Sequence, residues 1–229
     1  MLILAIDTST PAGSLAIMDD GREVAVRARD SSEDYSSRLF RELEAVLNEA
    51  DASLPEIGLY AVATGPGTFT GLRIGLTAAK AWAEVHGKPI VGVSTLEALA
   101  ALAPAAAGTI APVIDARRGQ VYAGAYSRSS GKLAPLFPDM VCSLPEFLQA
   151  LRPLDGMGGV TFISSTPNLL EGFRDTAGAL GVIEVAPVLA PSVGRIAFER
   201  AQRGEVTDAL HLDANYVRRS DAELLWKEK

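Results

Sequence analysis

The sequence predicts an α/β protein of two similar lobes, each a mixed sheet flanked by helices. Three observations support this. Short apolar segments alternate with segments of helical period, turn signals join some of the strands into hairpins, and the order of three strands, helix, strand, helix occurs twice along the 229 residues. Hairpins pair antiparallel and strand–helix–strand units pair parallel, so each sheet is expected to be mixed.

The first lobe is expected over residues 1–103. A hairpin signal, Asp19-Asp20-Gly21, joins its second and third strands, and Gly87 with Pro89 ends its second helix. Its expected elements are strands at 2–6, 14–18 and 23–29, a helix with apolar residues at helical period from Tyr35 to Ala50, a strand at 57–64, a helix at 70–86, a strand at 90–93 and a helix from 95 to 103.

The second lobe is expected over residues 104–206, with the C-terminal segment 207–220 allowed to pack back on the first lobe. In both lobes an Asp ends the first strand and a Gly precedes the second, which indicates an internal duplication. The expected elements are strands at 110–114, 121–126 and 140–142, a helix after Pro145, a strand at 160–164, a helix at 168–179, a strand at 182–185 and a helix at 192–203.

Composition excludes several classes of protein. With 21 basic and 28 acidic side chains the net charge is −7, and residues 1–100 alone carry 8 − 14 = −6, so the chain by itself is a poor candidate for holding RNA. A single cysteine permits neither an intramolecular disulfide nor a cysteine-based zinc cage. No basic leader precedes the first apolar run, and no apolar stretch approaches the roughly 18 residues of a membrane helix. A soluble, cytoplasmic protein is expected.

Two loops that follow strands are candidates for a nucleotide-like cleft between the lobes. Hydroxyls and backbone N–H groups after the first strand could line a phosphate, with an Asp reaching Mg²⁺ through water. The second loop, Gly-Pro-Gly-Thr-Phe-Thr-Gly at 65–71, leads directly into a helix N-terminus but matches neither dinucleotide nor P-loop patterns. The structural alternatives are an Asp that caps local backbone and a rigid, Pro-set turn that packs Phe69. The candidate cleft residues are Asp7, Thr8, Ser9, Thr10, Gly13, Gly65, Gly67 and Asp115.

The helix predicted at 70–86 has more apolar surface than one sheet requires. Its polar residues Arg73, Thr77, Lys80 and Glu84 form one narrow stripe, and almost every other position is apolar or small. It is therefore either a central core helix or a helix with one face for another chain. Phe40, opposite the Leu39 and Leu43 stripe of the preceding helix, favours a partner. The sequence has neither a G-x-S-x-G motif nor the residue order of a known catalytic triad, so no such pattern in it indicates catalysis.

Four motifs and the tail together resemble the TsaB family of bacterial proteins, within the wider TsaD-like, glycoprotease-like group. The resemblance spans nearly the whole chain. Its motifs are Ile-Asp-Thr-Ser-Thr at 6–10, Gly-Pro-Gly-Thr-Phe-Thr-Gly-Leu-Arg-Ile-Gly at 65–75, Gly-Val-Ser-Thr-Leu-Glu at 92–97, Ile-Asp-Ala-Arg-Arg-Gly-Gln-Val-Tyr at 114–122 and Tyr-Val-Arg-Arg at 216–219, followed by Ala222-Glu223.

The resemblance implies an actin-like, sugar-kinase-like (ASKHA) fold of two duplicated lobes. It also implies a non-catalytic partner of TsaD, the paralogue that forms threonylcarbamoyladenosine at position 37 of tRNA. TsaE, a small ATPase, would bind the pair, and the chain alone would be a homodimer. It implies contact with tRNA only through TsaD, no membrane, and no cofactor except ATP or ADP with Mg²⁺ inside the assembled complex. The interface residues it implies, on the first two helices, are Tyr35, Leu39, Leu43, Leu72, Arg73, Leu76, Thr77 and Lys80.

Departures from the paralogue argue against enzymatic activity. TsaD-like proteins hold a metal with H-x-E-x-H, and here Thr95 and Leu99 stand in place of the two histidines, so no metal site is expected. The Gly-Gly that packs on adenosine in TsaD aligns with Ser164-Ser165. Two alternatives stay open: an independent ATPase or kinase of the same superfamily, and a glycoprotease-like peptidase.

Overall fold

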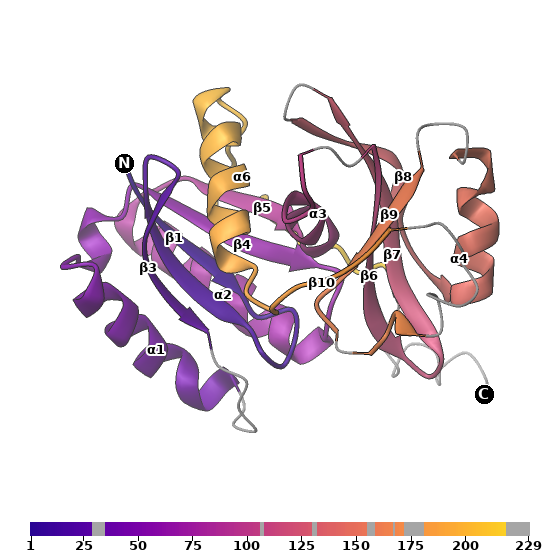
Figure 1. The fold of residues 1–229 in the computed structure, drawn as a ribbon. Coiled ribbons are helices and arrows are strands. Elements are labelled where there is room, and N and C mark those ends of the chain that lie inside the picture. The colour runs from indigo at the N-terminus through magenta and orange to yellow at the C-terminus, as the bar shows by residue number, and fades with distance from the viewer. Residues whose placement is uncertain are drawn as a thin grey trace. The chain divides into compact units, whose positions relative to one another are not determined.

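The computed structural model describes residues 1–28, 35–105, 108–129, 132–154, 159–166, 168–171 and 181–218. These residues form two compact units, each built on one five-stranded sheet (Figure 1). The first unit holds the described residues of 1–98 and 187–215, and the second those of 99–186 and 216–218. The chain passes from the first unit to the second within α3 (Thr95–Ala101).

The first sheet has the strand order β3-β2-β1-β4-β5. Its hairpins pair antiparallel, and β4 and β5 join in parallel through helical crossovers, as the sequence predicts for a mixed sheet. The central strands β1 and β4 are mostly apolar and are buried along almost their whole length, because both faces of the sheet are covered. The strands are β1 (Leu2–Asp7), β2 (Ser14–Asp19), β3 (Arg22–Ala28), β4 (Leu59–Gly65) and β5 (Ile90–Ser94).

Helices cover both faces of this sheet. Side chains of α1 (Tyr35–Glu49) and α2 (Phe69–His86) share one apolar core with Leu4, Ile6 and Val62, and the short η1 (Leu54–Glu56) precedes β4. On the other face lies α6 (Ala190–Gln202), where a Cβ on Gly194 would meet Met18 and Ala5. In Figure 1, α6 crosses in front of the sheet and α2 lies behind it.

The second sheet has the order β8-β7-β6-β9-β10, with the same alternation of antiparallel and parallel pairs. Strand for strand this repeats the first sheet, so the duplication predicted from the sequence is confirmed at the level of topology. Its elements are β6 (Thr109–Arg117), β7 (Gln120–Ser129), β8 (Lys132–Ser143), α4 (Leu144–Leu151), η2 (Arg152–Leu154), β9 (Val160–Ser164) and β10 (Gly181–Glu184).

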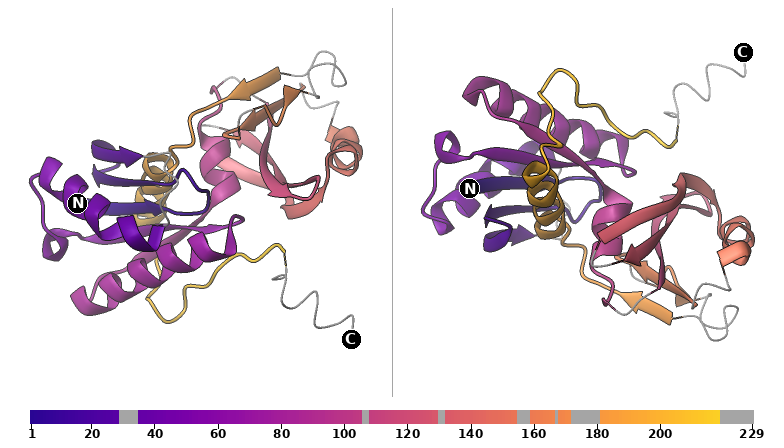
Figure 2. Two further views of the ribbon diagram at one scale, coloured as in Figure 1. Left: turned by 90° about the horizontal axis from the view of Figure 1, so that it is seen from below. Right: turned by 90° about the horizontal axis from the view of Figure 1, so that it is seen from above.

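The domain boundaries expected from the sequence need correction. The last helix was expected in the second lobe, within 104–206, yet α6 packs on β1, β2 and β4 and belongs to the first unit (Figure 2). The reason is that its small residues, among them Gly194 and Ala197, allow close approach to the first sheet. The segment from 207 to 215 also runs in the first unit, pairing Thr207 with Ile90. Most of the helix expected at 168–179 lies outside the described residues.

Candidate functional site

Asp7, the last residue of β1, closes a tight turn of the backbone. Its side chain is fully buried, and Oδ1 accepts hydrogen bonds from the Ser9 backbone N (2.9 Å) and the Ser9 Oγ (2.6 Å). Burial raises the pKa of the Asp7 carboxyl, because an apolar surrounding disfavours its charged form, and the two bonds from Ser9 oppose that rise. These contacts are those of a carboxyl that fixes its own loop.

The loop after Asp7 packs tightly against the beginning of α2. Thr8 Oγ1 donates a hydrogen bond to the Gly71 carbonyl at 2.7 Å, and the Thr68 N–H donates to the Ser9 carbonyl at 2.8 Å. A Cβ on Gly67 would collide with the Ser9 carbonyl, and one on Gly71 with the Thr8 carbonyl. The spacing of these glycines is therefore explained by close backbone packing.

The same closeness extends one turn further along α2. A Cβ on Gly75 would meet Thr8 Oγ1, so Gly67, Gly71 and Gly75, each four residues apart, all face the β1–β2 loop. Thr8 and Ser9 are each only 1% exposed. The hydroxyls of Thr8 and Ser9 thus make hydrogen bonds inside the protein. Within the first unit, the arrangement of Asp7, Thr8 and Ser9 therefore does not fit the binding of a phosphate or of Mg²⁺.

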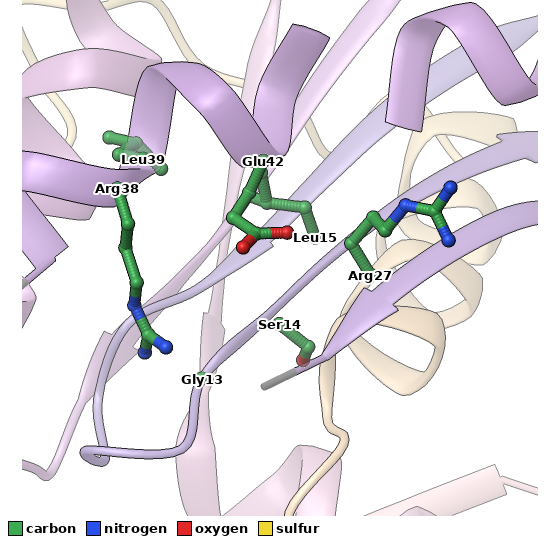
Figure 3. Close-up of a pocket in the computed structure, with 7 residues that line it drawn as sticks. All are labelled: Gly13, Ser14, Leu15, Arg27, Arg38, Leu39 and Glu42. Carbon is green, nitrogen blue, oxygen red and sulfur yellow. The ribbon is translucent and has the colours of Figure 1, made fainter. Parts of the chain in front are cut away.

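The far end of the loop is fixed by a buried arginine. Arg38 of α1 donates from Nη2 to the carbonyls of Pro11 (2.8 Å) and Ala12 (3.3 Å). Figure 3 shows its side chain reaching from α1 to the loop that ends at Gly13. Thr10 Oγ1 accepts a long bond, 3.5 Å, from the Gly13 N–H. A small hollow lies here, lined by Gly13, Ser14, Leu15, Arg27, Arg38, Leu39 and Glu42.

The C-terminal segment of the first unit closes the Gly65 end of the second loop. The backbone of Gly65 has φ of 114°, a value that residues with a side chain rarely adopt. A Cβ at this position would also meet the Asn215 carbonyl oxygen at 2.8 Å. The Asn215 N–H in turn donates to the Thr64 carbonyl at 2.8 Å. The structure thus brings seven of the eight candidate cleft residues together in one packed set of loops, from Asp7 to Gly13 and from Gly65 to Gly67.

The eighth candidate, Asp115, lies two residues before the end of β6 in the second unit and forms the same kind of turn as Asp7. Its Oδ1 accepts from the Arg117 backbone N at 2.7 Å, two residues on, and its own N–H donates to Thr166 Oγ1 at 3.5 Å. Unlike Asp7, its side chain is 34% exposed. Ser164, at the end of β9, is buried and its Oγ accepts from the Thr166 N–H at 3.0 Å.

Four of the expected interface residues belong to the core of the first unit, which corrects that expectation. Leu39, Leu43, Leu72 and Leu76 are all buried against the sheet. The family resemblance implies these residues as partner-facing, and a stripe of leucines on a helix has the same period whether a sheet or another chain covers it. Arg73 and Thr77 are exposed on α2.

Lys80 is likewise used within the unit, where its Nζ donates to the Leu212 carbonyl at 2.8 Å. Tyr35 begins α1, and its side chain lies outside the described part of the chain. The exposed apolar side chains of these helices are instead Phe40, Phe69 and Val85. Phe40 meets the ring of Trp82 edge-to-face at 6.2 Å.

The position of the paralogue's metal motif has a structural role in this chain. Thr95 and Leu99 are fully buried, and Arg200 Nη2 of α6 donates to both carboxylate oxygens of Glu97, at 2.8 Å to Oε1 and 2.6 Å to Oε2. Arg200 also donates to the Gly92 carbonyl at 2.6 Å. No local sequence pattern predicts this pair, because its members are 103 residues apart. Within the described ranges no cluster of three or more His, Cys, Asp or Glu side chains could hold a metal ion.

Among the helices of the described residues, none combines the length and the apolar character needed to cross a bilayer.

Comparison with known proteins assigns a family. Residues 26–159 match the TsaD family, described as tRNA N6-adenosine threonylcarbamoyltransferase. The chain is 34% identical over 229 residues to the tRNA threonylcarbamoyladenosine biosynthesis protein TsaB of Bacillus subtilis, covering 100% of this chain and 99% of that protein.

Solved structures agree on the fold. A Pseudomonas aeruginosa protein described as similar to peptidase YEAZ superimposes with a TM-score of 0.79 at 26% identity, covering 95% of this chain and 99% of the other. Component A of the (R)-2-hydroxyglutaryl-CoA dehydratase of Acidaminococcus fermentans gives a TM-score of 0.53 at 10% identity, covering 88% and 99%. The predicted actin-like, sugar-kinase-like fold class is confirmed.

Proposed function

The chain belongs to the TsaB family of tRNA threonylcarbamoyladenosine biosynthesis proteins, and from this premise we propose that it is the non-catalytic partner of a TsaD-type threonylcarbamoyltransferase. In this role it binds the transferase through α1 and α2, in the cytoplasm, and the pair receives the ATPase TsaE. Without the transferase, the same surface joins two copies of this chain.

The observation that carries the proposal is a second apolar face on the two helices. On α2, Ile74, Ala78, Ala81 and Val85 follow each other at intervals of four, three and four, so they share one side of the helix. Val85 is 77% exposed. The fully buried side of α2, with Leu72 and Leu76, is a separate stripe. Ile74 and Ala78 are only partly buried at the edge of the core, so the apolar surface of α2 extends beyond what the core covers. We define the outer helical face as Phe40, Ile74, Ala78, Ala81, Trp82 and Val85.

The composition of this face suits a protein partner. Phe40 is 67% exposed and packs its ring edge on Trp82, which gives the face a rigid aromatic centre. Arg73, Thr77 and Glu84 border it as a polar rim. An exposed apolar surface of this kind is typical of interaction sites.

Support for a non-catalytic role comes from the Glu97 and Arg200 pair. The one acidic residue retained from the paralogue's metal motif is engaged by a cation, and its neighbours Thr95 and Leu99 are buried. Loop contacts around Asp7 likewise serve internal packing. We therefore assign the transfer chemistry to the partner.

Light scattering after size-exclusion chromatography tests the proposal, with the chain alone and mixed with the TsaD-type protein of the same organism. We expect a homodimer that gives way to a complex of the two proteins. Phe40→Glu and Val85→Glu should abolish both associations, because each places a charge in the centre of the outer helical face.

Leu210→Glu is the matched control, because Leu210 is 81% exposed in the C-terminal segment of the same unit. It should leave both associations intact. The proposal would be contradicted if the chain is a monomer that does not associate with the transferase. It would also be contradicted if the Phe40→Glu and Val85→Glu variants associate as the unmodified chain does.

A further inference from the structure

The two helices that carry the outer helical face rest on different strands of the first sheet. α1 packs over β2 and β3, whereas α2 packs over β4 and β1. Phe40 is the member of the face that lies on α1, and the ring it meets, that of Trp82, lies on α2. The geometry of the face therefore depends on how firmly α1 is held relative to α2.

The apolar contacts of α1 do not fix its orientation by themselves. Its buried stripe consists of Leu39, Leu43 and Val46. Apolar burial has no preferred direction, so this stripe determines which side of α1 faces the sheet but leaves some rotation about the helix axis. The small hollow lies beside the stripe, between α1 and the strands β2 and β3 (Figure 3), so packing on that side of the helix is incomplete.

Arg38 makes a directional contact on the side of the hollow. Its side chain is only 1% exposed, and Nη2 donates to the carbonyls of Pro11 at 2.8 Å and of Ala12 at 3.3 Å. Burial of a guanidinium group costs free energy that well-placed hydrogen bonds and charges must offset. Because a hydrogen bond requires a set distance and direction, these bonds fix the rotation of α1 about its axis.

The loop that accepts these two bonds is itself held against α2. Thr8 Oγ1 donates to the Gly71 carbonyl, and the Thr68 N–H donates to the Ser9 carbonyl. One connected path thus runs from Arg38 of α1, through the backbone of residues 8–12, to the beginning of α2. The β1–β2 loop therefore links the two helices of the outer helical face.

Arg38 and Phe40 lie on opposite edges of the buried stripe of α1. Each residue of an α-helix is turned by about 100° from the one before it, so two positions apart point to nearly opposite sides. Arg38 is buried on the side of the loop, and Phe40 is 67% exposed on the side of Trp82. A rotation of α1 that breaks the bonds of Arg38 would consequently displace Phe40 from the Trp82 ring.

We propose that Arg38 is a positioning residue for the partner surface. By binding the Pro11 and Ala12 carbonyls it fixes α1 relative to α2, and so it holds Phe40 against Trp82 in the arrangement that the partner binds. The inference rests on the proposed function for the identity of that partner, the TsaD-type transferase. Since Arg38 is buried, it acts through Phe40 and not by touching the partner.

Two measurements on the full chain test this inference: titration with the transferase, and the near-ultraviolet circular dichroism of Trp82. A Trp226→Phe background leaves Trp82 as the remaining tryptophan. Arg38→Met keeps a long, unbranched side chain and removes the donors. We expect its dissociation constant for the transferase to rise about tenfold. The Trp82 band should change, because the Phe40 ring no longer packs at a fixed angle.

Val46→Ala is the matched control, because Val46 is fully buried in the same helix and has no polar side-chain atom. It should lower the urea midpoint of unfolding but leave the affinity for the transferase and the Trp82 band unchanged. A double-mutant cycle adds a second control. In a Phe40→Ala background, Arg38→Met should weaken association by no more than about twofold further, because Arg38 acts through Phe40.

The inference is overturned if Arg38→Met associates with the transferase as the unmodified chain does, or if it leaves the Trp82 band unchanged. It is overturned as well if Val46→Ala weakens association to the same degree, or if the full tenfold loss persists in the Phe40→Ala background. Should Arg38→Met fail to fold, Arg38→Lys decides, since lysine keeps the charge but not the planar fork. We then expect association about threefold weaker and a partly changed band, and no change in either overturns the inference.

The two proposals fail in different ways. If the unmodified chain does not associate with the transferase, the proposed function fails and the Trp82 band decides the role of Arg38. A changed band in Arg38→Met, with an unchanged band in Val46→Ala, then supports a residue that positions Phe40, and an unchanged band in both overturns it. If the unmodified chain associates and Arg38→Met associates equally well, the proposed function stands and the present inference does not.

Discussion

The two units share one strand topology but use its loops differently. Asp7 and Asp115 occupy equivalent strand ends and both accept a hydrogen bond from the backbone N–H two residues on. Asp7 is fully buried, whereas Asp115 is 34% exposed. The two units therefore share the same Asp turn at the end of the equivalent strand. The neighbouring loops determine whether the Asp carboxyl is packed against protein or exposed to water.

The glycines of the first unit account for this difference. Gly67, Gly71 and Gly75 let α2 and its leading loop approach the backbone of Thr8 and Ser9 closely enough to seal the turn. The equivalent strand β9 ends at Ser164 and is followed by Ser165 and Thr166, and Thr166 Oγ1 accepts from the Asp115 N–H. The comparison predicts that substitutions that disturb the packing around the Asp turn destabilise the protein more in the first unit than in the second.

The largest expected effect comes from reopening the sealed turn. Gly71→Ala should lower the free energy of unfolding by about 3 kcal/mol or more, because its Cβ would overlap the Thr8 carbonyl. Urea denaturation measures this. Gly87→Ala is the control, since Gly87 has φ of 60° and open space around it, and should cost only about 1 kcal/mol. A loss of less than 1 kcal/mol for Gly71→Ala would show that the loops separate easily.

The two carboxyls should respond differently to removal. Asp7→Ala leaves the buried N–H and hydroxyl of Ser9 without their acceptor, so it should cost about 1–3 kcal/mol. Asp115→Ala should cost less than about 1 kcal/mol, because water reaches that turn. Equal losses in urea denaturation would contradict the distinction between a sealed and an open turn.

Asp7 should also make stability depend on pH. Its pKa is raised in the folded chain above the ordinary value of 3.8, so the folded state binds the proton more strongly. Stability should therefore fall as pH rises from that value through the raised pKa. Asp7→Asn should remove this dependence and, at neutral pH, unfold at higher urea than the unmodified chain, by about 1.4 kcal/mol per unit of pKa rise. An unchanged pH profile in Asp7→Asn would contradict the effect of burial.

The smallest expected effect compares the two hairpin turns. Arg118→Asn should raise the free energy of unfolding by about 0.5 kcal/mol, because asparagine adopts the left-handed conformation more readily than arginine. Asp20→Asn, in the equivalent turn of the first unit, should change it by almost nothing. Thermal denaturation of both variants gives the comparison, and a destabilised Arg118→Asn would show that the arginine stabilises its turn.

Much of the fold could be predicted from the sequence because it depends on local signals. The Asp19-Asp20-Gly21 hairpin and the end of α2 at Gly87 are both as expected, and the structure confirms the repeated strand order. The placement of α6 could not be predicted, because the repeat suggested the second lobe and only the close approach of Gly194 to Met18 shows the first sheet as its partner.

The site was less predictable, since its contacts join distant segments. The leucines of α1 and α2 have the period of a buried stripe, and that period alone does not say what buries them. Phe40 lies opposite that stripe in the sequence and is exposed in the structure, and its role in an interface stays a prediction. The ion pair of Glu97 with Arg200 and the contact of Arg38 with Pro11 have no sequence signature.

The most direct test of the proposed role is to measure threonylcarbamoyladenosine formed in tRNA by the TsaD-type transferase, with the ATPase present, and with this chain added or left out. The proposal predicts modification only when the chain is added, none from the chain without the transferase, and a loss with Phe40→Glu but not with Leu210→Glu. Full modification without the chain, or undiminished modification with Phe40→Glu, would contradict it.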